Sequence, residues 1–107
     1  MSDRSIGVSE AFRLFGQEAP AHAAVWMSAV KGLDDASALD KKTEELAYLA
    51  VLAALGMESG VPFHVASARQ AGASRDEVIG AVLVGLPAAG QRVISSLPAA
   101  LSAYDAK

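Results

Sequence analysis

The sequence predicts an all-α fold, for three reasons. Glycine and proline divide the chain at intervals that suit helices, several segments begin with a residue that caps a helix N-terminus, and no segment shows the alternation or Asn-Gly turns of a sheet. The chain has 107 residues, of which 52% are apolar, and this length predicts a single domain over residues 1–107. Because a chain of this size buries only about two-thirds of its surface when it folds alone, the apolar fraction predicts self-association.

Composition also excludes several classes of function. Cysteine is absent, which excludes disulfides, thiol peroxidase chemistry and Cys-based zinc sites. The two histidines lack metal-ligand spacing, so we expect no metal and no cofactor. The net charge of −3, with basic residues scattered along the chain, predicts no nucleic-acid partner. The polar N-terminus, and a longest apolar run shorter than the roughly 20 residues of a membrane span, predict a cytoplasmic protein without a membrane partner.

Two helices are predicted in the N-terminal third of the chain. The first begins after the cap Ser9 and ends near Gly16. Pro20 suits the first turn of the second helix, which we expect to end at Gly32. Residues 33–39 are then predicted to form a loop.

The third predicted helix is the centre of the fold. Asp40 caps its N-terminus, and it runs from Lys41 to about Leu55, before Gly56. Its start is polar and the remainder is apolar on every side, so one neighbouring layer cannot cover it. Glu45 directly precedes the apolar part, where burial is expected to raise the pKa of its carboxyl and to require a partner.

A fourth helix is predicted to open at Pro62 and to close at Ala71-Gly72, where glycine can take the left-handed conformation. His64 lies in its first turn. Ser74 and Glu77 have the spacing of a capping box, which predicts the start of a fifth helix.

The C-terminal part of the chain is expected to be less regular. Pro87, Gly90 and Pro98 divide it into weaker helical pieces. The charged end, residues 105–107, is predicted to be frayed.

Only His22 and His64 are expected to titrate near neutral pH without a large shift. His22 lies among alanines without a patterned acidic neighbour, and we predict a structural or surface role for it. A lone histidine in an apolar helix is more often a core or interface residue than a functional one. On the residues alone, the structural interpretation of His64 is therefore favoured.

Several anchors at consistent spacing lie between residues 35 and 95. They are the run Leu39–Leu46, the segment Ala50–Gly56, His64, Ala68, Gly72 and Ser74-x-x-Glu77-Val78. Together they resemble the carboxymuconolactone decarboxylase family, which includes the AhpD-like proteins. The resemblance implies an AhpD-like bundle of about five to six helices that assembles into a homo-trimer or homo-hexamer.

The resemblance also implies which chemistry to expect. In the AhpD-like branch a Cys-x-x-Cys precedes the histidine, but Met57 and Gly60 stand at those positions here, so peroxidase activity does not carry over. The family's glutamate and histidine positions match Glu45 and His64. The cysteine-free Leu-Ala-Ala-Leu-Gly segment is more similar to the decarboxylase branch, whose members act on a carboxylated unsaturated lactone.

The enzymatic hypothesis is a cofactor-free decarboxylase or isomerase of a small carboxylated metabolite. His64 would transfer the proton, and Glu45 would orient the imidazole. Arg69, Arg92 or the N–H groups at the start of the fourth helix are candidates to bind the substrate carboxylate. A simple hairpin, however, places Glu45 about nine residues, or roughly 13 Å, from the level of His64. Contact then requires steeply crossing helices or a neighbouring subunit.

The alternative is a non-catalytic member of the fold that binds a small molecule or a protein partner. It would use an apolar pocket lined by Trp26, Tyr48, Met57 and Phe63. Because aromatic and Met residues at helical positions are more often simple core, this hypothesis stays open beside the enzymatic one.

Overall fold

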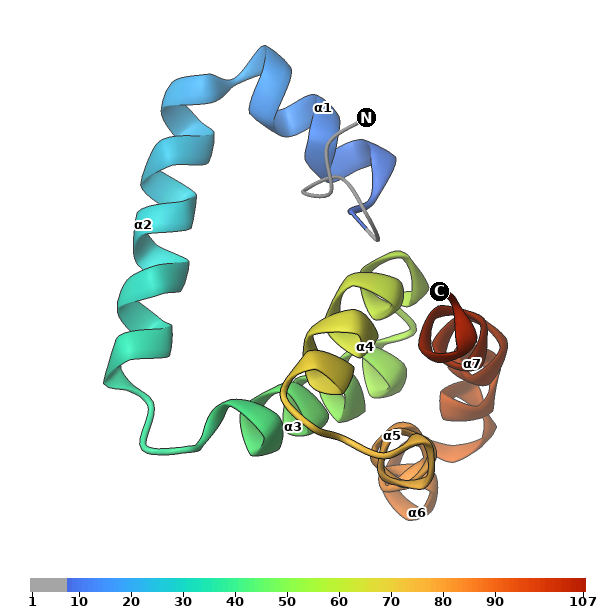
Figure 1. Ribbon diagram of the computed structural model, residues 1–107. Coiled ribbons are helices and arrows are strands. Elements are labelled where there is room, and N and C mark those ends of the chain that lie inside the picture. The colour runs from blue at the N-terminus through green and yellow to red at the C-terminus, as the bar shows by residue number, and fades with distance from the viewer. Residues whose placement is uncertain (1–7) are drawn as a thin grey trace.

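The computed structural model describes residues 8–107, and this part of the chain contains helices and no strand (Figure 1). The α-helices are α1 (Glu10–Glu18), α2 (Pro20–Ala36), α3 (Lys41–Leu55), α4 (Val61–Gln70), α5 (Arg75–Leu83), α6 (Leu86–Ala89) and α7 (Leu97–Asp105). Two 3₁₀ segments lie between them: η2 (Glu58–Gly60) connects α3 to α4, and η3 (Gly90–Ser96) connects α6 to α7. The predicted all-α class is confirmed. The polar N-terminal residues 1–5 lie outside the described part.

Local chemistry sets the ends of the helices that build the body. The Asp40 carboxylate accepts a hydrogen bond from the Thr43 N–H at 2.8 Å at the start of α3. Gly56, with φ of 72°, ends the same helix in the left-handed conformation. The capping box at α5 is complete, since the Glu77 N–H donates to Ser74 Oγ at 3.0 Å and the Ser74 N–H donates to Glu77 Oε1 at 2.8 Å. The predicted bounds of α3 and the start of α5 are confirmed.

The core is built around α3, which packs against α4, α5 and η3. Its buried apolar side chains are Leu49, Leu52, Ala53, Val61, Val65, Ala68, Ala73, Val78, Val82, Val93 and Ala100. The opposite side of α3 is open, because Tyr48, Val51 and Leu55 are 47%, 51% and 59% exposed. The central position of α3 is confirmed, but a single chain covers only one side of this helix.

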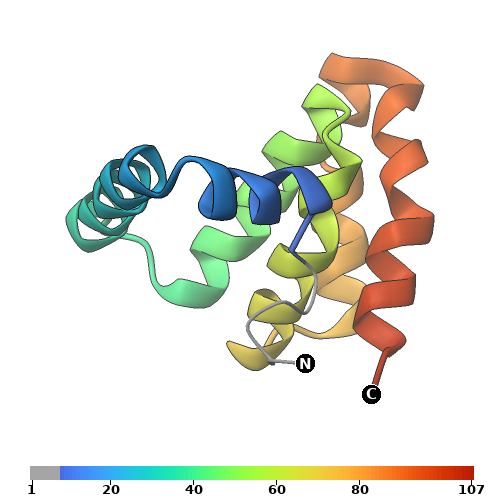
Figure 2. The same ribbon diagram turned by 90° about the horizontal axis from the view of Figure 1, so that it is seen from above.

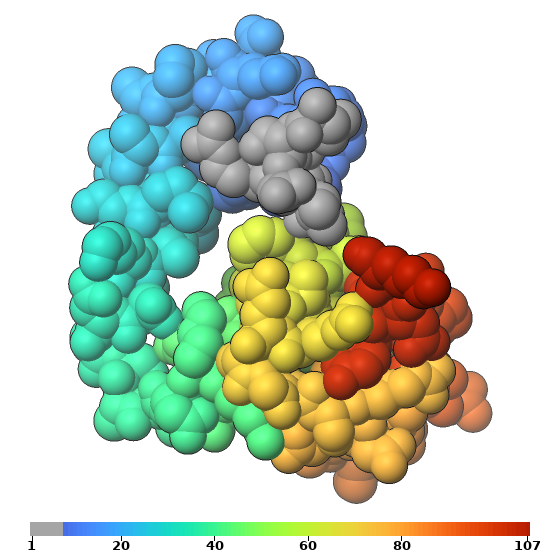
Figure 3. Space-filling view, in the orientation of Figure 1, coloured from blue at the N-terminus to red at the C-terminus, as the bar shows by residue number. Residues whose placement is uncertain are grey.

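The first two helices form an arm, defined here as residues 10–36, that stands apart from the body. In two perpendicular views α2 runs beside open space and joins the body through the segment before α3 (Figures 1 and 2). The space-filling view shows a gap between α2 and the body (Figure 3). Ser9 caps α1 as predicted, with Oγ accepting from the Phe12 N–H at 3.1 Å. Neither α1 nor α2 contains a buried residue.

The predicted end of the second helix at Gly32 is wrong, because α2 continues to Ala36. Within the described residues, positive φ is found at Gly56, Gly72 and Gly90, so Gly32 keeps a helical backbone. An ion pair of 3.0 Å between Lys31 Nζ and Asp35 Oδ2 joins the turns on either side of this glycine. Residues 33–36 are therefore helical, and the connection to α3 is short. The first helix likewise ends two residues after the predicted Gly16.

Gly32→Ala is expected to stabilise α2. A Cβ at this position would meet no atom within 4 Å, and the backbone is already helical. Alanine loses less backbone entropy on folding than glycine, so the substitution should stabilise the helix by about 0.5–1 kcal/mol. Hydrogen exchange of the α2 amides should then slow by about two- to fivefold. The matched control is Gly72→Ala, where φ is 99° and a side chain is strained. Faster exchange in α2 of the Gly32 variant would contradict this prediction.

The segment Arg75–Asp105 is long and apolar enough to cross a membrane by length and composition alone, since its most apolar stretch of 18 residues has a mean hydropathy of 1.5. In the fold it is divided into α5, α6, η3 and α7, with Pro87 and Pro98 in the first turns of α6 and α7. As one straight helix, 31 residues would measure about 46 Å, more than the 39 Å of the longest axis of the molecule. The segment instead supplies fully buried side chains to the core.

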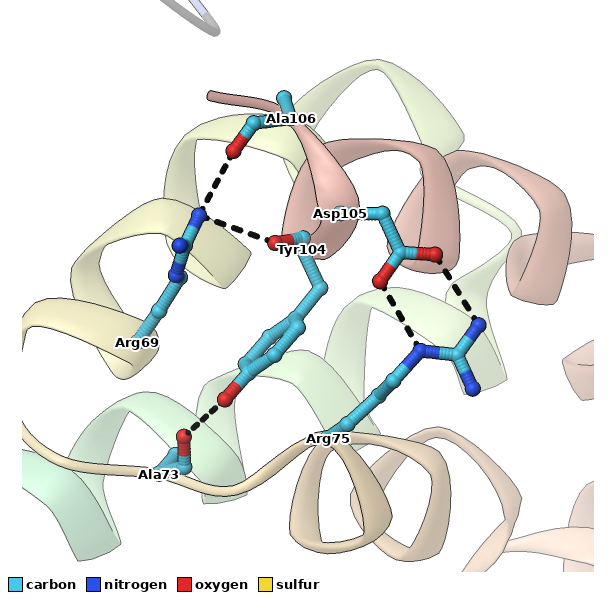
Figure 4. A network of polar contacts seen from close by, with 6 residues as sticks. All are labelled: Arg69, Ala73, Arg75, Tyr104, Asp105 and Ala106. Atoms are coloured by element: carbon cyan, nitrogen blue, oxygen red, sulfur yellow. Dashed lines mark hydrogen bonds and ion pairs between the residues drawn. The ribbon is translucent and has the colours of Figure 1, made fainter.

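The C-terminal end is held against the body, contrary to the predicted fraying (Figure 4). Arg75 donates two hydrogen bonds to the Asp105 carboxylate, from Nε at 2.9 Å and from Nη2 at 3.0 Å. Arg69 Nη1 donates to the carbonyl oxygens of Tyr104 and Ala106 at 3.0 and 2.7 Å. Two arginines thus fix the last turn of α7, where their positive charge also suits the helix C-terminus.

Candidate active site

The connection between α3 and α4 decides which residues of the two helices meet. After Gly56 the chain turns back, and a Cβ at Gly60 would lie 3.4 Å from Leu52 Cδ1. The chain has therefore returned to the level of Leu52 before α4 begins. One turn further along α4, the His64 ring lies against Tyr48, with 4.3 Å between ring centroids.

This path brings Glu45 and His64 into contact within one chain. His64 Nδ1 lies 2.8 Å from Glu45 Oε1. The separation expected from a simple hairpin is wrong, because η2 starts α4 beside Leu52 rather than at the end of α3. Glu45 lies one helical turn before Tyr48, and its side chain spans the remaining distance. A neighbouring subunit is not required for this pair.

The Glu45 carboxylate is buried and fully paired. Its side chain is 8% exposed, and Lys41 Nζ lies 2.9 Å from Oε2, the oxygen not used by His64. Burial is the largest influence on the pKa of Glu45 and raises it, but the hydrogen bonds and charges of His64 and Lys41 together hold this pKa below its ordinary value. Glu45 therefore has the partner that burial was expected to require, but its pKa is lowered and not raised as predicted.

The lowered pKa of Glu45 predicts a loss of stability in acid. The ordinary value is 4.5, and the folded value lies below it, so the stabilisation is complete above 4.5 and is lost as the pH falls through the folded pKa. Denaturant unfolding between pH 6 and pH 3 should show this decrease. Glu45→Gln cannot titrate and should flatten the pH dependence. An equal decrease in both proteins would contradict the assignment.

His64 is the accessible member of the pair. Its side chain is 25% exposed, and aromatic rings flank it, Tyr48 against the imidazole and Phe63 edge-on at 5.2 Å. An ionised carboxylate only accepts hydrogen bonds, so Nδ1 carries a proton toward Glu45. Nε2 is then the nitrogen that can exchange a proton with a bound molecule.

The two arginines predicted to bind the substrate carboxylate lie away from the pair. Arg69 is occupied by carbonyl groups at the end of α7, and Arg92 lies beside Gly56 at the far end of α3. At the start of α4, the Gly60 N–H donates to Met57 O and the Val61 N–H to Glu58 O, so these donors are already used.

Lys41 is the cation beside the pair, and the sequence reasoning missed it. Its ammonium contacts the carboxylate and is 56% exposed. The signal was its position four residues before Glu45 on the same helix, the spacing at which side chains on a helix surface meet.

The apolar residues of the alternative hypothesis are only partly brought together. Tyr48 and Phe63 flank His64, whereas Trp26 belongs to the arm. There it lines a hollow of about 560 Å³ between α1 and α2, together with Phe15, Ala21, His22, Val25 and Ala29. His22 is exposed on α2, which agrees with its predicted surface role. Among residues 8–107, no three His, Asp or Glu side chains are grouped so that they could hold a metal ion.

The family model described as "Carboxymuconolactone decarboxylase family" matches residues 20–102. The chain belongs to this family. The match includes α2, the whole core and both members of the Glu45–His64 pair. No match was found among curated proteins or among solved structures. This carboxymuconolactone decarboxylase family protein contains no cysteine, so no thiol accompanies the carboxylate and the imidazole of the pair.

Proposed function

We propose that this carboxymuconolactone decarboxylase family protein is a cofactor-free decarboxylase or isomerase of a small carboxylated metabolite. In this proposal His64 transfers the proton and Glu45 positions its ring. The observation that carries the proposal is the 2.8 Å contact between a buried carboxylate and an accessible imidazole. A carboxylate on one ring nitrogen fixes the tautomer and the orientation of the ring, as general acid–base catalysis requires.

Loss of carbon dioxide from a carboxylated unsaturated lactone gives each group a defined task. The bond between the ring carbon and the carboxylate breaks, carbon dioxide leaves, and the electron pair enters a dienolate. The imidazolium of His64 then donates its Nε2 proton to carbon, and water restores the proton afterwards. Glu45 stays ionised and holds the ring in place through its hydrogen bond with Nδ1.

Lys41 adds a positive charge at the entrance to the pair. Its ammonium is more than half exposed while it contacts Glu45 Oε2, so it can attract an anionic substrate without leaving the carboxylate. Tyr48 and Phe63 supply apolar ring surfaces beside the imidazole. A flat, carboxylated, unsaturated ring fits both features.

The direct test is the ultraviolet-monitored decay of carboxymuconolactone with purified protein. We expect first-order decay above the buffer rate, in proportion to protein concentration. No decay above buffer would remove this substrate. If the protein nevertheless binds the lactone and His64→Ala binds it equally well, the non-catalytic alternative replaces the enzymatic proposal.

A further inference from the structure

The two oxygens of the Glu45 carboxylate have separate partners. Oε1 lies 2.8 Å from Nδ1 of His64, and Oε2 lies 2.9 Å from Nζ of Lys41. The last torsion of a glutamate side chain has no sharply preferred angle, so the contacts of the carboxylate, and not the side chain itself, set its plane. A carboxylate with a partner on each oxygen cannot turn about this bond without losing both contacts. The direction of Oε1 toward His64 therefore depends on Lys41.

The burial of Glu45 makes this contact stronger than an ordinary ion pair on the surface. The side chain of Glu45 is 8% exposed, whereas that of Lys41 is 56% exposed. An ion pair between two exposed side chains contributes little, because water competes with both partners. Removing one partner of a buried charge has a larger effect, because the remaining charge is then uncompensated. The carboxylate therefore depends on the ammonium more than the exposure of the ammonium itself indicates.

The ammonium of Lys41 is held in its charged form by its surroundings. The hydrogen bond with Glu45 is the largest influence on the pKa of Lys41 and raises it, and the negative charges of Glu45, Asp34 and Glu44 act in the same direction. Burial opposes them but does not prevail. The charged groups that act on Glu45 are in turn His64 on α4 and Lys41 on α3.

The other cations near α3 are directed elsewhere. Lys42 is the next residue along the helix, but its Nζ lies 3.0 Å from Glu77 Oε2 on α5. Arg92, on η3, lies beside Gly56 at the other end of α3. Among the described residues, neither of these cations forms an ion pair with Glu45. Lys42 can therefore serve as a matched control for the loss of one lysine and one ion pair.

We propose that Lys41 is a positioning residue of the candidate site: by holding Oε2, it fixes the Glu45 carboxylate so that Oε1 stays directed at Nδ1 of His64. This inference rests on the proposed function for what the pair does, but the contact itself needs no substrate. It is also distinct from the attraction of an anionic substrate. Loss of attraction raises KM, whereas loss of positioning lowers kcat.

Carbon-13 NMR of the glutamate carboxyl groups tests the contact without a substrate, and the Glu45 signal is identified by its absence from Glu45→Gln. In Lys41→Met the Glu45 titration should move to higher pH, because burial, which raises this pKa, is then opposed by His64 alone. Lys41→Arg keeps the positive charge and should restore the original titration. Lys42→Met should leave it unchanged. An unchanged titration in Lys41→Met, or an equal change in both Met variants, would overturn the proposal.

Turnover of the lactone then separates positioning from attraction. Lys41→Met should lower kcat by about tenfold, an effect within the range for residues coupled in one hydrogen-bond network. The same change made in Glu45→Gln should lower kcat no further, because the residue through which Lys41 acts has already been altered. A rise in KM alone, or an equal loss of kcat in both backgrounds, would overturn the positioning role. A shifted Glu45 titration in Lys41→Met, with no turnover by the unmodified protein, would instead contradict only the proposed function.

Discussion

His64→Ala is expected to reduce turnover of the carboxylated lactone by about 10²–10⁴-fold, the usual contribution of a positioned proton donor. The reason is that His64 is the accessible half of the pair, whereas Glu45 is buried behind it. Steady-state decay of the lactone measures the loss. Added imidazole is expected to restore part of the activity, because it can occupy the space left by the side chain and supply the same proton.

The variant must remain folded for this result to be informative. His64 is only partly buried, so circular dichroism and sedimentation of His64→Ala should match those of the unmodified protein. Glu45→Gln keeps the shape of the side chain but removes its charge, and we expect a smaller loss that imidazole does not restore. Full turnover by His64→Ala would contradict the proposed role and leave His64 as a structural residue.

Leu49→Ala should destabilise the fold by about 2–5 kcal/mol, the largest effect on stability that we expect. Leu49 is fully buried on the inner side of α3, against which α4, α5 and η3 pack. Truncation removes apolar contacts on a side chain that has no exposed surface, and the surrounding helices can collapse only in part. Denaturant unfolding at one fixed protein concentration measures the difference.

The matched control for this change is Leu39→Ala, in the connection between the arm and α3. Leu39 is 52% exposed, so its truncation should cost less than about 1 kcal/mol. Equal losses in the two variants would show that the inner side of α3 does not form the core of the folded chain.

The fold was predictable from the sequence wherever short-range chemistry sets an element. The cap Asp40 and the C-terminal Gly56 fix both ends of α3 through bonds made within the helix itself. Gly32 does not end α2 as predicted, because a glycine ends a helix only if its backbone turns left-handed, and that depends on the chain that follows. The prediction that the end of α7 is frayed was wrong, because Arg69 and Arg75, which are distant in the sequence, donate hydrogen bonds to it.

The sequence pointed to Glu45 and His64 as candidate residues, but not to Lys41 or to the contact within the pair. Glu45 and His64 follow from the family pattern, yet their contact depends on the backbone at Gly60 packing against the Leu52 side chain, which is a contact between separate segments of the chain. The direction of the Glu45 pKa shift was predicted wrongly for the same reason. The apolar run indicates that Glu45 is buried, but it does not show the partners whose hydrogen bonds and charges lower the pKa.

The protonation state of the His64 ring tests the central claim most directly. Nitrogen-15 NMR resolves the two ring nitrogens, and His22 is the only other histidine in the spectrum. With Glu45 accepting from Nδ1, neutral His64 should carry its proton on Nδ1 and leave Nε2 free, and Glu45→Gln should change this preference. A neutral His64 protonated on Nε2 in the unmodified protein would contradict the account, because the carboxylate would then not position the ring for proton transfer.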